Sequence, residues 1–317
     1  MTYAQGSLIL AADYNGLVGT TTSTTANQIN TVWAVGSGSA GYGQTAITNV
    51  SQLGTVTATQ WATLINTLNS ILTHQAGSGS GVSAVTAGQT IAYLSAVNTG
   101  VTTAYTNRLN FSSNSAAIVN GSQSTAWTSA TTISTLTRSF GIRAAFATAD
   151  QARYFFNAGG RFKLNVSGTQ NASTTARTNA AIALCTDLGG VGLFAANTNA
   201  GRTGTGGTLG TNATTIGYHT STYGANVTLV SVTSTTASYT SDTATITVST
   251  NGTQGANNDK GTNVDFWINM SSTSGANAGG LSFDDSLGVN IIRSIDISYP
   301  EVTNISNTWG AVTITSL

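Results

Sequence analysis

Apolar residues follow a helical period in the first third of the chain and alternate with polar residues in most of the remainder. The helical period is clearest between residues 61 and 72, where the spacing i, i+3, i+4, i+7, i+10 and i+11 predicts one apolar stripe on a helix. A Gly-rich stretch at residues 75–79 predicts where this helix ends. The stripe consists of Trp61, Leu64, Ile65, Leu68, Ile71 and Leu72.

The motif Thr-Ala-x-Gln recurs in this region, at residues 25–28, 57–60 and 86–89. It has the spacing of a capping box, in which the Thr hydroxyl accepts from the N3 amide and the Gln side chain reaches back to the cap. Helical spacing follows each copy, and a further short helix is expected around Asp13. Residues 1–110 are therefore predicted to form a small helical domain that docks on a larger particle.

Beyond residue 111 the apolar period becomes two, which is typical of half-buried strands. Helices are expected to interrupt the strands at residues 148–157, behind a fourth capping box, and at residues 179–188. Strands are expected at residues 130–147, 161–167, 227–234, 244–249, 264–270, 289–298 and 309–314. The predicted fold is α+β: a small N-terminal helical domain, a linker at residues 111–130, and a mainly antiparallel β-sandwich at residues 131–317 with two inserted short helices.

Charged residues are scarce in this sequence. The 317 residues include 10 Lys+Arg and 10 Asp+Glu, a charged content of 6 %, whereas soluble domains average about 25 %. Between residues 1 and 107 only Asp13 is charged. The zero net charge excludes nucleic acid as a main partner, and no apolar run is long enough to insert into a membrane. Because charge normally keeps proteins apart, we expect this chain to form homo-oligomers within an assembly.

Cofactor and metal chemistry find little support in the sequence. Cys185 is the sole cysteine, which excludes an intrachain disulfide and a thiolate metal cage. His74 and His219 cannot supply a three-His site, and His74 is expected to bond the free carbonyls at the end of its helix. The Gly-rich stretches lack the pattern of a phosphate-binding loop and are interpreted as linkers and turns. We therefore expect no cofactor and no metal.

Carboxylates are the better lead to an enzyme, because glycoside hydrolysis requires two of them close together. Residues 257–263 form an oxygen-rich turn that could hold Ca²⁺, but they lack the acidic pattern of a calcium loop, so a hairpin or sandwich loop is favoured. No nucleophile elbow is present for a Ser-His-Asp triad. The chain is predicted not to be an enzyme. The candidate carboxylates are Asp265, Asp284, Asp285, Asp296 and the sole glutamate, Glu301.

A cluster of basic residues is the main candidate for partner contacts. It could bind an acidic glycan, nucleic acid or a partner subunit, or its charges could protect strand edges against unwanted pairing. Trp127 lies in a Ser/Thr-rich segment, where it could be exposed to a partner or a sugar. Together with Trp127, the candidate contact residues are Arg138, Arg143, Arg153, Arg161 and Lys163.

The segment at residues 150–162, with its Tyr-Phe-Phe-Asn-x-Gly-Gly core, resembles a segment of virion structural proteins of tailed bacteriophages, notably marine cyanophages. The pattern Asn-Gly-Thr … Gly-Thr-x-Val-x-Phe at residues 251–266 is similar to the same group. So are Asp-Tyr-Asn at residues 13–15 and Gly-Tyr-Gly-Gln at residues 41–44. The resemblance implies a protein of a phage particle, and it transfers no catalytic residues.

The expected function is a structural component of a tailed-phage virion, a neck or tail appendage such as a fibre or collar. It would self-assemble and dock on other virion proteins, after assembly in the host cytoplasm. The alternative is a receptor-binding module that recognises a host surface glycan. A capsid decoration protein and a glycan depolymerase are the remaining hypotheses.

Overall fold

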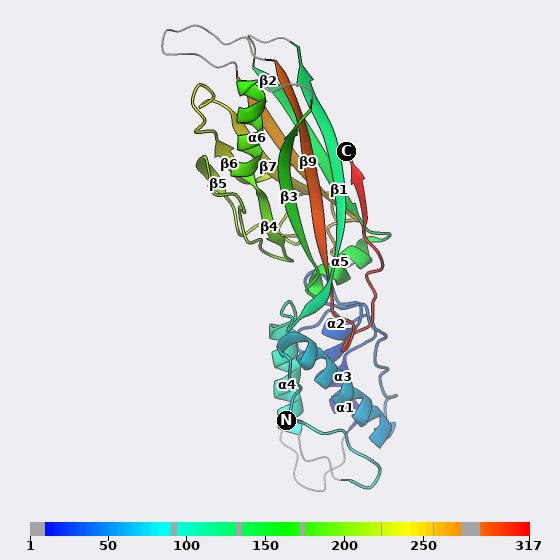
Figure 1. Ribbon diagram of the computed structural model, residues 1–317. Helices are drawn as coiled ribbons and strands as arrows, with labels where there is room; N and C mark the ends of the chain where they lie inside the picture. Colours follow the sequence, from blue (N-terminus) through cyan, green and yellow to red (C-terminus); the bar gives the residue numbers. More distant parts are fainter. Residues whose placement is uncertain are drawn as a thin grey trace.

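The computed structural model shows an elongated molecule, in which a helical part and a β-sandwich are joined end to end (Figure 1). It describes residues 10–89, 94–130, 135–171, 175–222, 224–255, 257–273 and 286–317. The N-terminal helices are followed by mostly antiparallel strands in two sheets, which confirms the predicted α+β class.

The helical part is built around the apolar stripe predicted from the sequence. Its helices are α1 (Ala11–Val18), α2 (Ile29–Trp33), α3 (Ala58–Ala76) and α4 (Leu94–Thr106). Trp61 and Leu68 on α3 are completely buried, and the Trp61 ring centroid lies 6.5 Å from that of Tyr14 on α1. Burial of this stripe holds the short helices together, because helices of this length are marginal on their own.

The Thr-Ala-x-Gln motif caps helices at only some of its positions. Thr57 and Gln60 form the predicted capping box at the start of α3, and Gly77 ends that helix with a φ of 78°. The copy at residues 25–28 does not cap α2, because Asn27 takes a φ of 61° and the N-cap is Gln28. At residues 86–89 the Gln side chain accepts from the Thr86 amide, but the described part of α4 begins only at Leu94.

The Thr57 cap gives a first stability prediction. Thr57→Ala should lower the free energy of unfolding by about 1 kcal/mol, because the Gln60 amide loses its side-chain acceptor. Urea denaturation followed by circular dichroism measures the loss. Thr59→Ala, an exposed position within the same turn, is the matched control and should change stability by less than about 0.5 kcal/mol. Equal effects of the two substitutions would contradict the capping role.

Two antiparallel sheets face each other in the sandwich. Sheet A has the order β1-β9-β3-β4, and sheet B has the order β10-β2-β8-β7-β6-β5. The strands of sheet A are β1 (Asn114–Ser129), β9 (Leu287–Pro300), β3 (Arg161–Gln170) and β4 (Gly190–Phe194). Those of sheet B are β10 (Thr313–Ser316), β2 (Leu136–Ala145), β8 (Asn263–Ser272), β7 (Thr243–Thr250), β6 (Val227–Thr233) and β5 (Thr208–Asn212).

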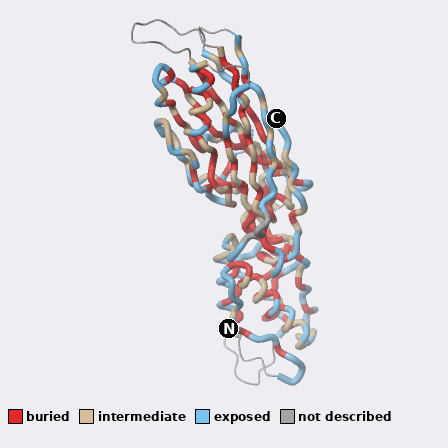
Figure 2. Tube along the Cα trace, in the orientation of Figure 1, coloured by how far each residue is buried: buried red, intermediate tan, exposed pale blue. Residues whose placement is uncertain are grey.

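Strict alternation along the strands fills the space between the sheets, as Figure 2 shows by the buried stretches inside the sandwich. In β8, Val264, Phe266 and Ile268 are buried, while the residues between them are partly exposed. Two helices complete this core, and both are close to their predicted positions. Helix α5 (Ala149–Asn157) closes the base through an aromatic cluster around Phe155, and α6 (Ala176–Leu188) lies along β3 and also contacts β6 and β7.

The prediction of a linker at residues 111–130 is wrong. This segment contains β1, which pairs with β9 from Ile118 to Ser129. Its sequence is rich in Ser, Thr, Asn and Gly because β1 is the edge strand of sheet A, and few of its described side chains are buried. Such a strand carries little of the apolar alternation by which strands are recognised.

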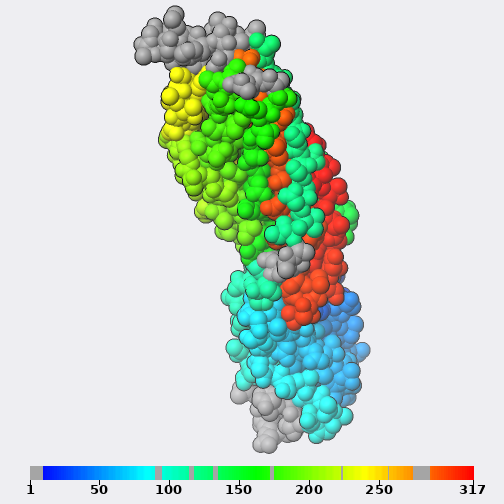
Figure 3. All heavy atoms as spheres, viewed as in Figure 1, coloured from blue at the N-terminus to red at the C-terminus, as the bar shows by residue number. Residues whose placement is uncertain are grey.

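The C-terminal segment also differs from its prediction. A strand is expected at residues 309–314, but β10 begins at Thr313, and Trp309 is buried in a loop. Between β9 and β10 the chain returns to the helical part, where residues 301–309 lie against it (Figure 3). The helical part is therefore completed by residues from the far end of the sequence.

Candidate functional site

The helical part and the sandwich meet where the Gly-rich loop at residues 34–44 rests on α5. The buried Arg153 donates from Nη1 to the Ala40 carbonyl at 2.5 Å and from Nη2 to the Val35 carbonyl at 2.7 Å. Its guanidinium also pairs with Asp150, with Nη2 3.0 Å from Oδ1. These charge-assisted bonds fix the loop on the helix. We call this region the joint; it comprises residues 34–44, α5 and residues 251–262, together with His74, His219 and residues 301–309, which are bonded to one another or to these segments.

A second set of bonds in the joint runs through amide side chains. Asn157 donates from Nδ2 to the carbonyls of Gly38 and Gly41, both at 3.1 Å. Its Oδ1 is thereby left to accept from Nε2 of His219 at 2.8 Å, which assigns the proton of the neutral imidazole to Nε2. The Gly38 amide donates to the Asn257 carbonyl at 2.8 Å, so the β7–β8 loop closes the third side.

The glycines of the 34–44 loop are required by close packing. A Cβ on Gly43, whose φ is 70°, would lie 2.4 Å from the Tyr154 ring, and one on Gly41 would lie 2.0 Å from the Val35 carbonyl oxygen. Interpreting this stretch as a linker or turn therefore misses its role, because the loop is the contact surface itself. Residues 41–44, 150–162 and 251–266 meet at this joint.

The returning segment at residues 301–309 fastens the joint from the opposite side. His74 does not bond helix-end carbonyls as expected: its Nδ1 lies 3.0 Å from Oε1 of Glu301, and the ring is completely buried. Gln44 exchanges two hydrogen bonds with the main chain of Ser306, at 2.8 and 3.0 Å. Thr308 donates to the Tyr42 carbonyl at 2.6 Å. Hydrogen bonds thus hold together three segments that are distant in the sequence: residues 42–44, His74 and residues 301–308.

The titratable groups of the joint have shifted pKa values. Burial lowers the pKa of His74 against the opposing effect of Glu301. Burial alone would raise the pKa of Glu301, but hydrogen bonds from His74, Asn304 and Thr303 outweigh it and lower the pKa to about 2. Burial, together with the positive charges of Arg153, Lys260 and Arg108, lowers the pKa of His219 to about 3. The joint therefore holds neutral histidines beside an ionised glutamate.

The five candidate basic residues do not form one patch. Arg153 is buried in the joint, and Arg138 is exposed at the open end of β2, where it donates to the Ala126 carbonyl. Arg143 forms a bidentate pair with Asp265 on the outer face of sheet B, with both contacts at 2.7 Å. Arg161 and Lys163 lie on the outer face of sheet A, where Arg161 stacks over the Phe111 ring at 3.8 Å. These basic residues are close together in the sequence, but the fold places them in the joint and on the outer faces of two different sheets.

Trp127 does not stand exposed to a partner. Only 4 % of the residue is accessible, and its ring packs edge-on against Phe140 with centroids 5.9 Å apart. The cause is strand β1 itself, which turns Trp127 toward sheet B. Trp127 is therefore a core residue of the sandwich.

The candidate carboxylates are dispersed among the described residues. Asp265 pairs with Arg143 on sheet B, Asp296 accepts from Asn120 and Asn165 on sheet A, and Glu301 lies in the joint. Asp284 and Asp285 lie outside the described residues. In the 257–263 loop, the Asp259 carboxylate accepts from the amides of Gln254, Gly255 and Gly261, which makes it the brace of the β7–β8 hairpin.

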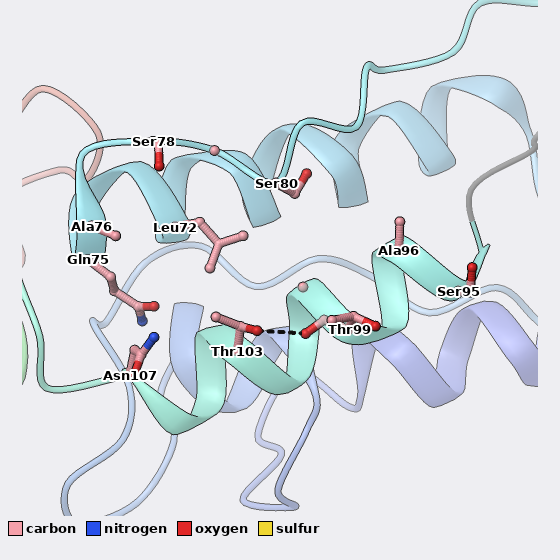
Figure 4. A pocket seen from close by; sticks show the side chains of 12 residues that line it. Leu72, Gln75, Ala76, Ser78, Ser80, Ser95, Ala96, Thr99, Thr103 and Asn107 are labelled. Atoms are coloured by element: carbon pink, nitrogen blue, oxygen red, sulfur yellow. Dashed lines mark hydrogen bonds between the residues drawn. The ribbon is translucent and has the colours of Figure 1, made fainter.

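A groove of about 480 Å³ runs between α3 and α4 in the helical part (Figure 4). Small and hydroxyl-bearing side chains line it, including Ala96, Thr99 and Thr103, and Leu72 and Gln75 lie on its α3 side. No charged residue lines it. Gln75 donates to the Tyr42 hydroxyl and the Ala104 carbonyl, so its amide mainly ties α3 to α4 and to the joint.

Buried charge is a feature that the sequence did not reveal. Arg293 projects between the sheets, where it donates to the Gly141 carbonyl at 2.8 Å, to Thr125 Oγ1 at 3.0 Å and to Ser316 Oγ at 2.6 Å. It thereby links β9 to β1, β2 and β10. Several of the few charges therefore lie inside, and charged residues are as scarce on the described surface as in the whole sequence. The buried charged residues are Asp13, Arg153, Arg177, Asp242, Asp259, Arg293 and Glu301.

Comparisons with known proteins found no relative of this chain. No family model matches the chain, and neither the curated proteins nor the solved structures include a significant match. Across the described ranges, no His, Cys, Asp and Glu side chains gather in threes as a metal site would require. Within the same ranges, no helix has the length and apolar character needed to cross a membrane.

Proposed function

We propose that this protein is a self-assembling structural subunit of a tailed-phage virion, belonging to a neck or tail appendage. The observation that carries the proposal is the scarcity of charge on the surface of an elongated body. A net charge of zero and buried arginines remove the repulsion that keeps freely diffusing proteins apart. The resemblance of the joint segments to virion structural proteins supports the assignment to a phage particle.

Exposed apolar residues near the joint are the best candidates for contact between subunits. Ile118, Val119 and Val302 are 61 %, 49 % and 62 % exposed. Ile118 pairs with Ser298, two residues before Pro300, so these residues lie near the same end of sheet A, with the side chains of Ile118 and Val119 on opposite faces of β1. A hollow of about 430 Å³ beside Val302 is lined by Tyr299, Pro300 and the edge of the buried Trp309. Apolar surface of this kind, on a chain without net charge, suits a second copy of the same chain.

Light scattering of the purified full chain tests the proposal. We expect a discrete oligomer at micromolar concentration, and the double substitution Ile118→Lys and Val302→Lys should reduce the mass to that of the monomer. Leu209→Lys is the matched control, because Leu209 is 44 % exposed on β5 at the far edge of sheet B. A monodisperse monomer of the unaltered chain at high micromolar concentration would contradict assembly, and imaging of the particle would test the location.

A further inference from the structure

The outer face of sheet B carries a tryptophan, Trp267, with the exposed Leu317 beside it. Trp267 lies in the middle of β8, between Gly141 on β2 and Thr247 on β7. A Cβ on Gly141 would lie 2.6 Å from Leu317 Cβ and 2.8 and 3.0 Å from two atoms of the six-membered ring of Trp267, so the ring and Leu317 together cover the bare backbone of the glycine. Trp267 is partly exposed, whereas Trp61, Trp127 and Trp309 are buried.

Planar hydrogen-bonding groups flank this ring on both sides along the strand. Two residues before it, Asp265 holds Arg143 in the bidentate pair, with side-chain exposures of 15 % and 33 %. Two residues after it, Asn269 accepts from Ser139 Oγ at 2.7 Å. The rungs of Asp265 and Asn269 are separated by about 13 Å, four strand residues. A shallow hollow of about 330 Å³, lined mostly by Ser, Thr and Asn side chains, continues the surface past Asn269.

We infer that this face binds a neutral oligosaccharide. The C–H face of a sugar packs on an indole ring, while its hydroxyls bond in-plane donors and acceptors such as a guanidinium, a carboxylate and a carboxamide. The charges of Arg143 and Asp265 cancel within the pair, so the described surface next to Trp267 offers no unmatched charge to a glycan, and the exposed cation Arg138 lies beyond Asn269, where it lines the hollow. The indole N–H of Trp267 has no acceptor among the described residues, whereas that of the other partly exposed tryptophan, Trp33, donates to the Thr45 carbonyl.

A glycan array tests this inference with the full chain. It should carry neutral probes such as maltohexaose, cellohexaose and galactan oligosaccharides beside anionic probes such as sialyllactose and oligogalacturonate. We expect binding to at least one neutral probe. Trp267→Ala should weaken it by about tenfold or more, because the loss of a stacked ring removes more than 1.4 kcal/mol. Trp267→Phe should retain part of the affinity, and Asp265→Asn should weaken it, because an amide has a single acceptor oxygen and no charge with which to hold Arg143 in place.

Trp33→Phe is the matched control and should leave the affinity unchanged, because Trp33 lies in the helical part. In this variant the remaining exposed tryptophan is Trp267, so a bound neutral sugar should protect its fluorescence against acrylamide. Circular dichroism verifies that each variant is folded. Binding to anionic probes alone, no binding to any probe, or equal binding by Trp267→Ala would overturn the inference. Light scattering of the same samples separates this result from the assembly proposal, since either can fail alone.

Discussion

Arg153→Met is expected to lower the free energy of unfolding by about 3–5 kcal/mol, the cost of breaking a buried charged network by removing one partner. The methionine fills a similar volume but leaves the carbonyls of Val35 and Ala40 without their donor. It also leaves Asp150 without the guanidinium that lies 3.0 Å away. Urea denaturation measures the loss. Because the joint connects both parts, the midpoint followed by tryptophan fluorescence should move with that followed by circular dichroism.

Arg138→Met is the matched control for this substitution. Arg138 also donates to a main-chain carbonyl, that of Ala126 at 2.8 Å, but it is exposed at the end of β2. Its loss should cost less than about 0.5 kcal/mol, because water replaces the bond. If Arg153→Met and Arg138→Met were equally mild, the joint would not be held by the buried guanidinium.

Acidification from pH 7 to pH 4 is expected to destabilise the protein by about 2–3 kcal/mol through His219, allowing for partial exposure of its ring. In the folded state burial lowers the pKa of His219 to about 3, whereas in the unfolded chain it is 6.5. Between these values the unfolded state binds a proton that the folded state does not, so stability falls as the pH falls below 6.5. The lowered pKa of His74 acts in the same direction.

The glutamate of the joint extends this loss to lower pH. The pKa of Glu301 is about 2 in the folded state against a usual value of 4.5, so its contribution is lost as the pH falls from 4.5 toward 2. His219→Gln removes the higher-pH step, because a glutamine amide can still donate to Asn157 Oδ1 but does not titrate. Thermal unfolding at half-unit pH intervals should show a flatter profile between pH 6.5 and 4 for this variant. An unchanged profile would show that His219 does not titrate as described.

Secondary structure was predictable wherever burial falls on one face of an element. The α3 stripe and the alternation in β8 are both local patterns, and both elements were placed correctly. Strands β1 and β5 were missed because they are edge strands, whose described side chains are mostly exposed and polar. The short strand β4 was missed as well, because it is buried along most of its length and shows no alternation. The burial of Arg293 does have a signal in the sequence, because Arg293 occupies the buried phase of β9, between Ile291 and Ile295.

The joint could not be derived from the sequence, since most of its bonds connect residues more than 100 positions apart. The sequence suggests that Arg153 belongs to a basic cluster, because sequence order gives no sign that its guanidinium bonds the carbonyls of residues 35 and 40. The pairing of Trp267 with Gly141 depends likewise on strand register, which follows from the folded sheet. Local sequence patterns predict the helices and strands. Which side chains stay exposed depends on the contacts between these helices and strands, and those contacts cannot be read from local patterns.

The pairing of β1, β9 and β3 should make this fold resistant to tension along its long axis. Strands β1 and β9 leave the sandwich at the same end, toward the helical part (Figure 1). A pull on the helical part therefore loads both strands in one direction, and the load passes to β3 through the pairing that runs from Arg161–Ser298 to Gln170–Val289. These hydrogen bonds lie perpendicular to the strands, so they shear together instead of opening one at a time. The molecule should extend little under axial force and yield more readily when pulled sideways.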